Sequence, residues 1–352
     1  MLVNSVSGGV LVFKNLFKLT FALMILFQSI CASSQINSQS QLQNKEIDDS
    51  GDSEAPRVPD EAIYQLDGET YHYKKRDFWP MIMGLPGDLE EFYRRSMLEE
   101  SRPWLWAVVA STALGIYYDQ DILDEAVRLA QRWGLPQKDK TKTMINIAGL
   151  PIGFPTDVSS GLYFIGDGMI HGGIMVGFLG GGYYSRSLRA YQTGIQMIQG
   201  LALTAFATQV LKHITGRESP FTTETPGGVW RFFPDQIAYH KNVPKYDAYP
   251  SGHMATTMVT TTILAGNYPE YSTAIWSVGS VAMLGLGFGM LNNGVHWFGD
   301  YPLSLAMGYV FGRIAVDEGR EVKASSETGV LPKILPLIGS DGSFKLHLHW
   351  NI

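Results

Sequence analysis

Three short stretches decide the fold of this chain: residues 212–220 read KHITGRESP, residues 250–253 read PSGH, and residues 296–300 read HWFGD. Residues 221–249 separate the first stretch from the second. All three lie at apolar segments or in the loops between them. Together they supply basic side chains, a Ser-Gly-His sequence after a proline, and a histidine four residues before an aspartate.

The last stretch predicts a nucleophile. His296 and Asp300 are four residues apart, so on a helix their side chains share one face. A carboxylate in that position can hold one imidazole N–H and leave the other nitrogen free to attack phosphorus. A hydrogen-bonded core histidine is the alternative interpretation of His296.

The other two stretches predict a phosphate site. Ser251, Gly252 and His253 follow a proline at the expected start of a helix, where successive backbone N–H groups attract an anion. Gly252 allows close approach to the backbone, and His253 is placed to protonate a leaving oxygen. Lys212 and Arg217 supply positive charge for the phosphate oxygens. Helix capping by Ser251 and a charge at a helix C-terminus for Lys212 are the structural alternatives.

The order and spacing of these motifs resemble the type 2 phosphatidic acid phosphatase and vanadium haloperoxidase superfamily. Its pattern is Lys-x6-Arg-Pro, then Pro-Ser-Gly-His, then Ser-Arg-x5-His-x3-Asp, and the resemblance covers about residues 100–318. It implies a helical bundle in which His296 forms a phosphohistidine that water later hydrolyses. It also implies that neither a metal nor another cofactor is required.

Two arginines of that pattern are missing. Ser219 stands before Pro220, and Met290 stands six residues before His296, preceded by Gly289. Neither serine nor methionine can hold phosphate with two hydrogen bonds as arginine does. The candidates to replace them are Arg217, Arg231, His240, Lys241, Lys245, Asn292 and Asn293.

Composition narrows the class of protein. Of 352 residues, 45% are hydrophobic and only 17% are charged, so most of the chain has enough apolar surface to fold. The net charge of −6 argues against nucleic acid as a partner. A single cysteine, Cys31, excludes a disulfide scaffold and zinc–cysteine sites.

The middle of the chain predicts an all-α fold. Residues 104–118, 190–211 and 271–299 contain no charged side chain, and several such segments are long enough to span a bilayer. They suit the interior of a compact bundle equally well. Asp119, with Asp121 and Asp124 after it, is interpreted as capping an amphipathic segment that follows.

The ends of the chain predict further parts. Lys14 and Lys18 flank a short apolar run, as in a secretory signal. Near the C-terminus, alternating apolar residues after a glycine-rich turn at 339–342 predict a β-hairpin. The predicted organisation is a signal peptide (1–34), a disordered polar tether (35–60), an N-terminal extension (61–99), a helical phosphatase-like domain (100–318) and a C-terminal tail with the hairpin (319–352).

The sequence therefore predicts an exported phosphatase that is periplasmic or membrane-associated. Its expected partners are a phosphorylated small molecule or a lipid phosphate, and a membrane. The expected reaction is hydrolysis of a phosphomonoester or a diphosphate. A catalytically impaired relative that binds phosphate or lipid, or has a structural role, is the alternative. A vanadate-dependent haloperoxidase ranks third, because vanadate binding depends even more on the missing arginines.

Overall fold

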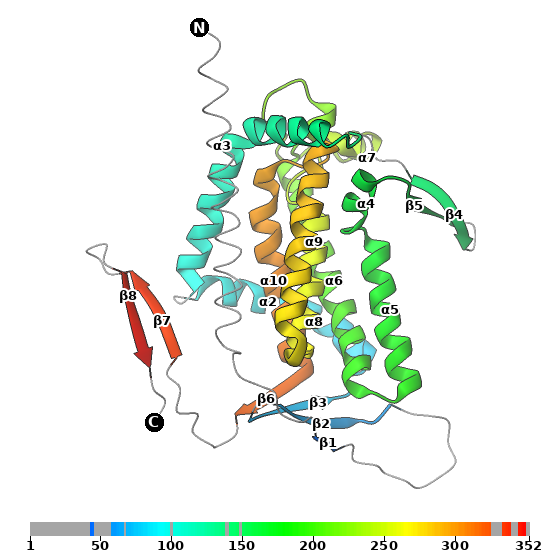
Figure 1. Ribbon diagram of the computed structural model, residues 1–352, viewed down its shortest axis with the longest axis vertical. Coiled ribbons are helices and arrows are strands. Elements are labelled where there is room, and N and C mark those ends of the chain that lie inside the picture. Colours follow the sequence, from blue (N-terminus) through cyan, green and yellow to red (C-terminus); the bar gives the residue numbers. More distant parts are fainter. Residues whose placement is uncertain are drawn as a thin grey trace.

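In a computed structural model of the protein, the described residues are 43–45, 58–66, 68–98, 101–137, 141–147, 150–324, 333–338 and 344–349. Helices form most of this part (Figure 1). They are α2 (Phe78–Met97), α3 (Arg102–Arg132), α4 (Val158–Phe164), α5 (Gly168–Ser185), α6 (Leu188–Thr215), α7 (Gln236–Lys241), α8 (Gly252–Asn267), α9 (Ser272–Asn292) and α10 (Tyr301–Gly319).

Short antiparallel strands accompany the helices. One sheet has the order β1-β2-β3-β6, and β4 pairs with β5 and β7 with β8 in two separate hairpins. The strands are β1 (Gln43–Lys45), β2 (Glu61–Leu66), β3 (Glu69–Lys74), β4 (Thr141–Ile147), β5 (Leu150–Pro155), β6 (Arg320–Ala324), β7 (Lys333–Ile338) and β8 (Phe344–His349).

The predicted fold class, a helical bundle with a C-terminal β-hairpin, is confirmed. In the hairpin, Ile338 of β7 lies opposite Phe344 of β8, and the predicted turn between them falls outside the described residues. The four-stranded sheet was not predicted. Its strand β1 and the buried Val58 both fall in the stretch expected to be a tether. The predicted signal peptide, residues 1–34, also lies outside the described residues.

The centre of the bundle is the close contact of α8 with α10. A Cβ atom on Gly308 would lie 2.5 Å from the carbonyl oxygen of Ala255, and one on Gly312 would lie 2.7 Å from the Cβ of Thr262. Only glycine lets the two backbones approach so closely. Helix α6 packs against the same pair of helices, and the buried side chains there are Met197, Leu203, Val259, Ile263, Met307, Phe311, Ile314, Ala315 and Val316.

Polar side chains of α6 attach the small sheet to one end of the bundle. Gln192 donates to the carbonyl of Lys74 at the end of β3 and accepts from the backbone of Arg76. The Arg76 guanidinium in turn donates to Gln199, at 2.8 Å. These two glutamines of α6 therefore bind a backbone carbonyl, a backbone N–H and a guanidinium at the end of β3. The sheet closes the lower end of the bundle in Figure 1, opposite the end at which α7 lies.

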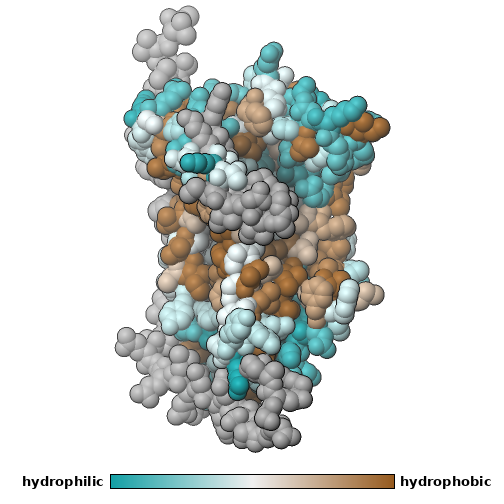
Figure 2. Space-filling view, turned by 90° about the vertical axis from the view of Figure 1, so that its right-hand side faces the viewer, coloured by the Kyte–Doolittle hydropathy of each residue, from teal (hydrophilic) through white to brown (hydrophobic). Residues whose placement is uncertain are grey.

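The outer surface carries an apolar band. In Figure 2, which views the side with α5, hydrophobic residues gather at mid-height between hydrophilic upper and lower ends. Within the described ranges, two segments are long and apolar enough to cross a membrane, α6 and Pro269–Asn292, and the bent pair α4–α5 would be a third. Exposed apolar side chains on these segments include Met169, Val176, Phe206, Val210, Val278 and Val281. The band and these segments indicate association with a membrane.

The contact between α8 and α10 is testable with one substitution made at two places. Gly308→Ala pushes a methyl group against the Ala255 backbone and is expected to destabilise the protein by about 1–3 kcal/mol. Gly173→Ala on α5 meets no atom within 4 Å, so it should leave stability unchanged or raise it by up to about 1 kcal/mol. Unfolding of the purified protein in mixed micelles measures both, and equal effects would show that α8 and α10 are not in close contact.

Candidate active site

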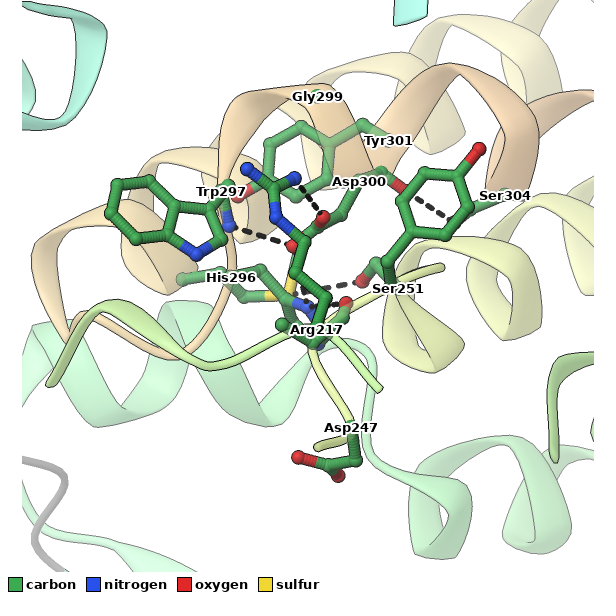
Figure 3. A network of polar contacts seen from close by, with 12 residues as sticks. Arg217, Asp247, Ser251, His296, Trp297, Gly299, Asp300, Tyr301 and Ser304 are labelled. Carbon is green, nitrogen blue, oxygen red and sulfur yellow. Dashed lines mark hydrogen bonds and ion pairs between the residues drawn. The ribbon is translucent and has the colours of Figure 1, made fainter. Parts of the chain in front are cut away.

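The three motifs meet at one end of the bundle. Lys212 lies on the last turn of α6, and Ser251 is the N-cap of α8. His296 follows α9, and Asp300 ends the short 3-10 helix η5 (Phe298–Asp300). We expected His296 and Asp300 to share a helix, but they lie in the turn between α9 and α10. The turn still brings their side chains into contact (Figure 3).

The hydrogen bonds of His296 fix its tautomer. Its Nδ1 lies 2.7 Å from the carbonyl oxygen of Ala248 and 3.3 Å from Oδ2 of Asp300. A carbonyl oxygen can only accept, so Nδ1 carries the proton. In the neutral ring Nε2 is then unprotonated and has a lone pair to offer. His296 is buried, and these two contacts hold the orientation of its ring.

Asp300 binds more than the histidine. Its Oδ2 also accepts from the backbone N–H of Trp297, at 2.8 Å, while Oδ1 accepts from Arg217 at 2.6 Å. Its own carbonyl accepts from the Ser304 hydroxyl and from the backbone of Ser251. The carboxylate is fully buried, and these contacts give it a single orientation.

His253 lies beside the nucleophile candidate. Its ring centroid is 6.4 Å from that of His296 and 4.5 Å from the ring of Tyr163 on α4. Burial lowers the pKa of His253 to about 3, and the positive charge of Lys212 acts in the same direction. The imidazole is therefore neutral at pH 7 while no anion is nearby.

The predicted phosphate-binding residues Lys212, Ser251 and Gly252 border the same place. The Lys212 ammonium lies 3.4 Å from Asp247, and its side chain is 9% exposed. Ser251 accepts from the backbone N–H of Met254, which is the predicted helix cap. A Cβ on Gly252 would only touch Thr208, at 3.7 Å, so the packing does not require glycine there.

Ser219 and Met290, which stand where the pattern has arginine, both make other contacts. Ser219 is buried, and its backbone N–H donates to Pro244. Met290 is fully buried, and its sulfur accepts from the Ser251 hydroxyl at 3.5 Å. Met290, which replaces an arginine of the pattern, thus binds the hydroxyl of Ser251, a predicted phosphate-binding residue.

Three of the proposed substitutes are engaged elsewhere. Arg231 pairs with Glu218 at 3.2 Å. Asn292 donates to Pro136 and to Ser159, and Asn293 accepts from the same serine. The Nδ2 group of Asn293 is buried without a hydrogen-bond partner, so it is a donor that remains available in this region.

Arg217 differs most from its prediction as a phosphate ligand. Its guanidinium is fully buried, and it donates to Asp300, Asp119 and the carbonyl of Gly227. Its Cζ lies 4.7 Å and 5.3 Å from the ring centroids of Trp230 and Trp297. The guanidinium therefore faces carboxylates and indoles, and two buried aspartates compensate its charge.

Asp119 is the residue that the sequence did not reveal. It lies in the middle of α3, so it does not cap a helix as we expected. It is fully buried, where it accepts from Arg217 and from the backbone of Gly299. Burial raises the pKa of Asp119 to about 6, against the attraction of Arg217. The position of Asp119 as the first acid after the charge-free stretch 104–118 was the available signal.

No set of metal ligands is found within the described ranges. There, no group of three or more His, Cys, Asp or Glu side chains lies close enough together to hold a metal ion.

Comparison with known proteins gives a family for the segment that carries the motifs. The family model described as "PAP2 superfamily" matches residues 193–317. This segment belongs to the PAP2 superfamily. The match confirms the resemblance and contains every predicted site residue, whereas Asp119 lies outside the PAP2 segment.

No curated protein sequence matches the chain. Among solved structures, the crystal structure of a transmembrane PAP2-type phosphatidylglycerolphosphate phosphatase from Bacillus subtilis is similar with 13% sequence identity and a TM-score of 0.36. The similarity covers 68% of this chain and 93% of that chain.

The lowered pKa of His253 predicts an acid-sensitive fold. Between pH 6.5 and about 3 the unfolded chain binds a proton at this residue and the folded chain does not, so stability falls as the pH drops below 6.5. From pH 7.5 to pH 5, wild type should lose about 2 kcal/mol more than His253→Gln. Unfolding at the two pH values measures this difference. The same loss in both proteins would mean that His253 is not held neutral by its surroundings.

Proposed function

We propose that this protein is a phosphatase that cleaves a phosphomonoester or a diphosphate through a phosphohistidine at His296. The observation that carries the proposal is the Nδ1 contact of His296 with the Ala248 carbonyl, which leaves Nε2 as the nucleophilic atom. Lys212 lies close enough to His253 to lower its pKa, and the His253 ring centroid lies 6.4 Å from that of His296, so a proton donor and a cation are available near that atom.

In the first step, Nε2 of His296 attacks phosphorus and the P–O bond to the leaving group breaks. The leaving oxygen takes a proton from His253. An anionic phosphate favours the imidazolium form of His253, because it offsets the charges that lower the pKa of this residue. Positive charge develops on the phosphorylated ring of His296, and the adjacent Asp300 carboxylate stabilises it.

In the second step, water attacks the phosphohistidine. His253, now neutral, accepts a proton from the water as the new P–O bond forms and the P–N bond breaks. His296 returns to its Nδ1-protonated form, and inorganic phosphate leaves. Lys212 and the backbone N–H groups at the start of α8 are the proposed ligands of the phosphate oxygens, with Ser251 and Gly252 at that position.

The apolar surroundings favour a lipid phosphate as the substrate. The apolar band of Figure 2 and the segments long enough to cross a bilayer would hold the protein where such lipids are found. A lipid substrate also gains affinity from its acyl or prenyl chain, which offsets part of the phosphate affinity that the missing arginines would have supplied.

A relative that binds phosphate without hydrolysing it is the second candidate. The contact between Ser251 and Met290 favours it, because the serine hydroxyl is occupied by a thioether where the pattern has arginine. Loss of one positioned oxyanion donor commonly lowers the rate by about a hundred- to a thousand-fold.

We also propose that the chain is exported and is periplasmic or membrane-associated, with residues 1–34 as a removable signal and residues 100–318 as the functional domain. The support is the basic flank and apolar run around Lys14 and Lys18. The amino-terminal sequence of the purified chain tests this proposal, and a chain that still begins at Met1 would contradict it.

The enzyme proposal predicts a trapped intermediate. Purified wild type, given p-nitrophenyl phosphate, a lipid phosphate or a prenyl diphosphate, should release phosphate, and acid-labile labelled phosphate should be trapped on the protein. His296→Asn removes Nε2 and should abolish both signals, because no other nitrogen takes its place. Phosphate release and label trapping measure the two steps separately.

His213→Asn is the matched control. His213 lies on α6 and donates to Gln209 within its own helix, so its loss should leave phosphate release and label trapping unchanged. If wild type and His296→Asn release equal amounts of phosphate, the proposal of catalysis through His296 is refuted. Binding of inorganic phosphate without any release would establish the second candidate.

A further inference from the structure

We propose that Arg217 and Asp119 are positioning residues, which hold the two hydrogen-bond acceptors of His296 and do not bind the phosphate. The inference rests on the proposed function insofar as His296 is the nucleophile. It assigns a role to Asp119, which lies on α3 and outside the PAP2 segment.

The first acceptor of His296 is the Asp300 carboxylate. Arg217 donates to Oδ1 of Asp300 at 2.6 Å, on the side opposite to the oxygen that faces the histidine. The other end of the guanidinium is fixed by Asp119 and by the Gly227 carbonyl. The position of the carboxylate thus depends on a cation whose other end is itself held.

The second acceptor is the Ala248 carbonyl. The backbone carbonyl of Arg217 accepts from the N–H of Ala248 at 2.9 Å, and Arg217 also forms a parallel bridge with Asp247. Arg217 therefore fixes Asp300 through its side chain and Ala248 through its main chain. Both of these groups accept from Nδ1 of His296, so Arg217 alone sets the direction in which Nε2 points.

Asp119 completes the arrangement from α3. Its Oδ1 accepts from the backbone of Gly299, at 2.8 Å, and its Oδ2 accepts from Arg217. Helix α3 comes this close to Gly299 because two glycines meet there. A Cβ on Gly115 would lie 2.7 Å from the Cα of Gly299. Asp119 thereby ties α3 both to the turn that carries Asp300 and to the cation that orients it.

Charge supports the same role. Arg217 is one buried cation between two buried carboxylates, so the cluster is negative when both are ionised. Negative charge behind the ring stabilises the cationic histidine that forms when Nε2 is phosphorylated. To reach a phosphate, the guanidinium would have to leave two aspartates unpaired in the interior, which is strongly unfavourable.

The competing role is a direct phosphate contact through Nε of Arg217, which is buried without a hydrogen-bond partner. The two roles differ in what they change. A phosphate ligand sets the affinity for substrate and for inorganic phosphate. A positioning residue sets kcat and the tautomer of His296, and leaves those affinities unchanged.

The experiment compares Asp119→Asn, Arg217→Gln and Arg217→Lys with wild type. Asp121→Asn and Arg313→Gln are matched controls, because both residues are exposed or partly exposed on the surfaces of α3 and α10. For Asp119→Asn and Arg217→Gln, kcat should fall about a hundred-fold. KM and the inhibition constant of inorganic phosphate should change less than about three-fold, and Arg217→Lys should recover part of kcat because it keeps the charge.

A second measurement is independent of activity. In ¹⁵N-histidine NMR spectra, assigned with His296→Asn, wild type should show His296 protonated at Nδ1, and Asp119→Asn and Arg217→Gln should show a mixture of tautomers. Variants that do not fold are replaced in both measurements by Arg217→Lys, which is expected to show a smaller change in the same direction. If wild type releases no phosphate, the proposed function fails. The tautomer of His296 in wild type and in the variants still tests whether Arg217 and Asp119 position this residue.

Three results would overturn the inference. The first is a kcat loss no larger than that of Asp121→Asn. The second is a rise in KM and in the phosphate inhibition constant with kcat unchanged. The third is a His296 tautomer that is the same in wild type and in the Asp119 and Arg217 variants.

Discussion

The buried guanidinium of Arg217, enclosed by Asp119 and Asp300, is the interaction on which the rest of the site depends. All three side chains are fully buried. Each ion costs several kcal/mol to remove from water, so the arrangement is stable only if nearly all of its donors and acceptors are paired. The Gly227 carbonyl, the Trp297 and Gly299 N–H groups and two indole faces supply the remaining contacts. A loop, a helix and a turn from distant parts of the chain are thereby fixed to one another.

This network also explains how the PAP2 segment joins the rest of the protein. Residues 193–317 contain both histidines and Asp300, but the second carboxylate comes from α3. The close approach of Gly115 and Gly299 brings that helix within reach. At the opposite end, Gln192 and Gln199 of α6 hold the small sheet. The apolar band lies between these two polar ends, as expected for a protein associated with a membrane.

The sequence predicted what depends on local pattern. The order and spacing of the motifs led to His253, His296 and Asp300, and the structure brings these residues together at one end of the bundle. Long apolar segments without charge predicted the helices, and Ser251 was considered as a helix cap. These features are encoded within a few residues of one another.

What the sequence did not reveal depends on contacts between distant residues. Asp119 and Arg217 are separated by 98 positions, so no local pattern links them, and the acidic residues after Asp119 made capping the simpler interpretation. The direction of Arg217 could not be predicted either, because it follows from which charges are buried around it. Strand β6 of the small sheet was missed for the same reason, since its partner strand β3 lies far from it in the sequence.

The most direct test of this account is a double-mutant cycle on the free energy of unfolding, with Asp119→Leu, Arg217→Met and the double variant. Each single substitution leaves a buried charge without its partner and should cost about 3–5 kcal/mol. In the double variant, Asp300 keeps its other contacts, so the loss should be smaller than the sum by at least about 2 kcal/mol. If the two single losses of unfolding free energy add up to the loss in the double variant, Asp119 and Arg217 are not coupled, and the account is contradicted.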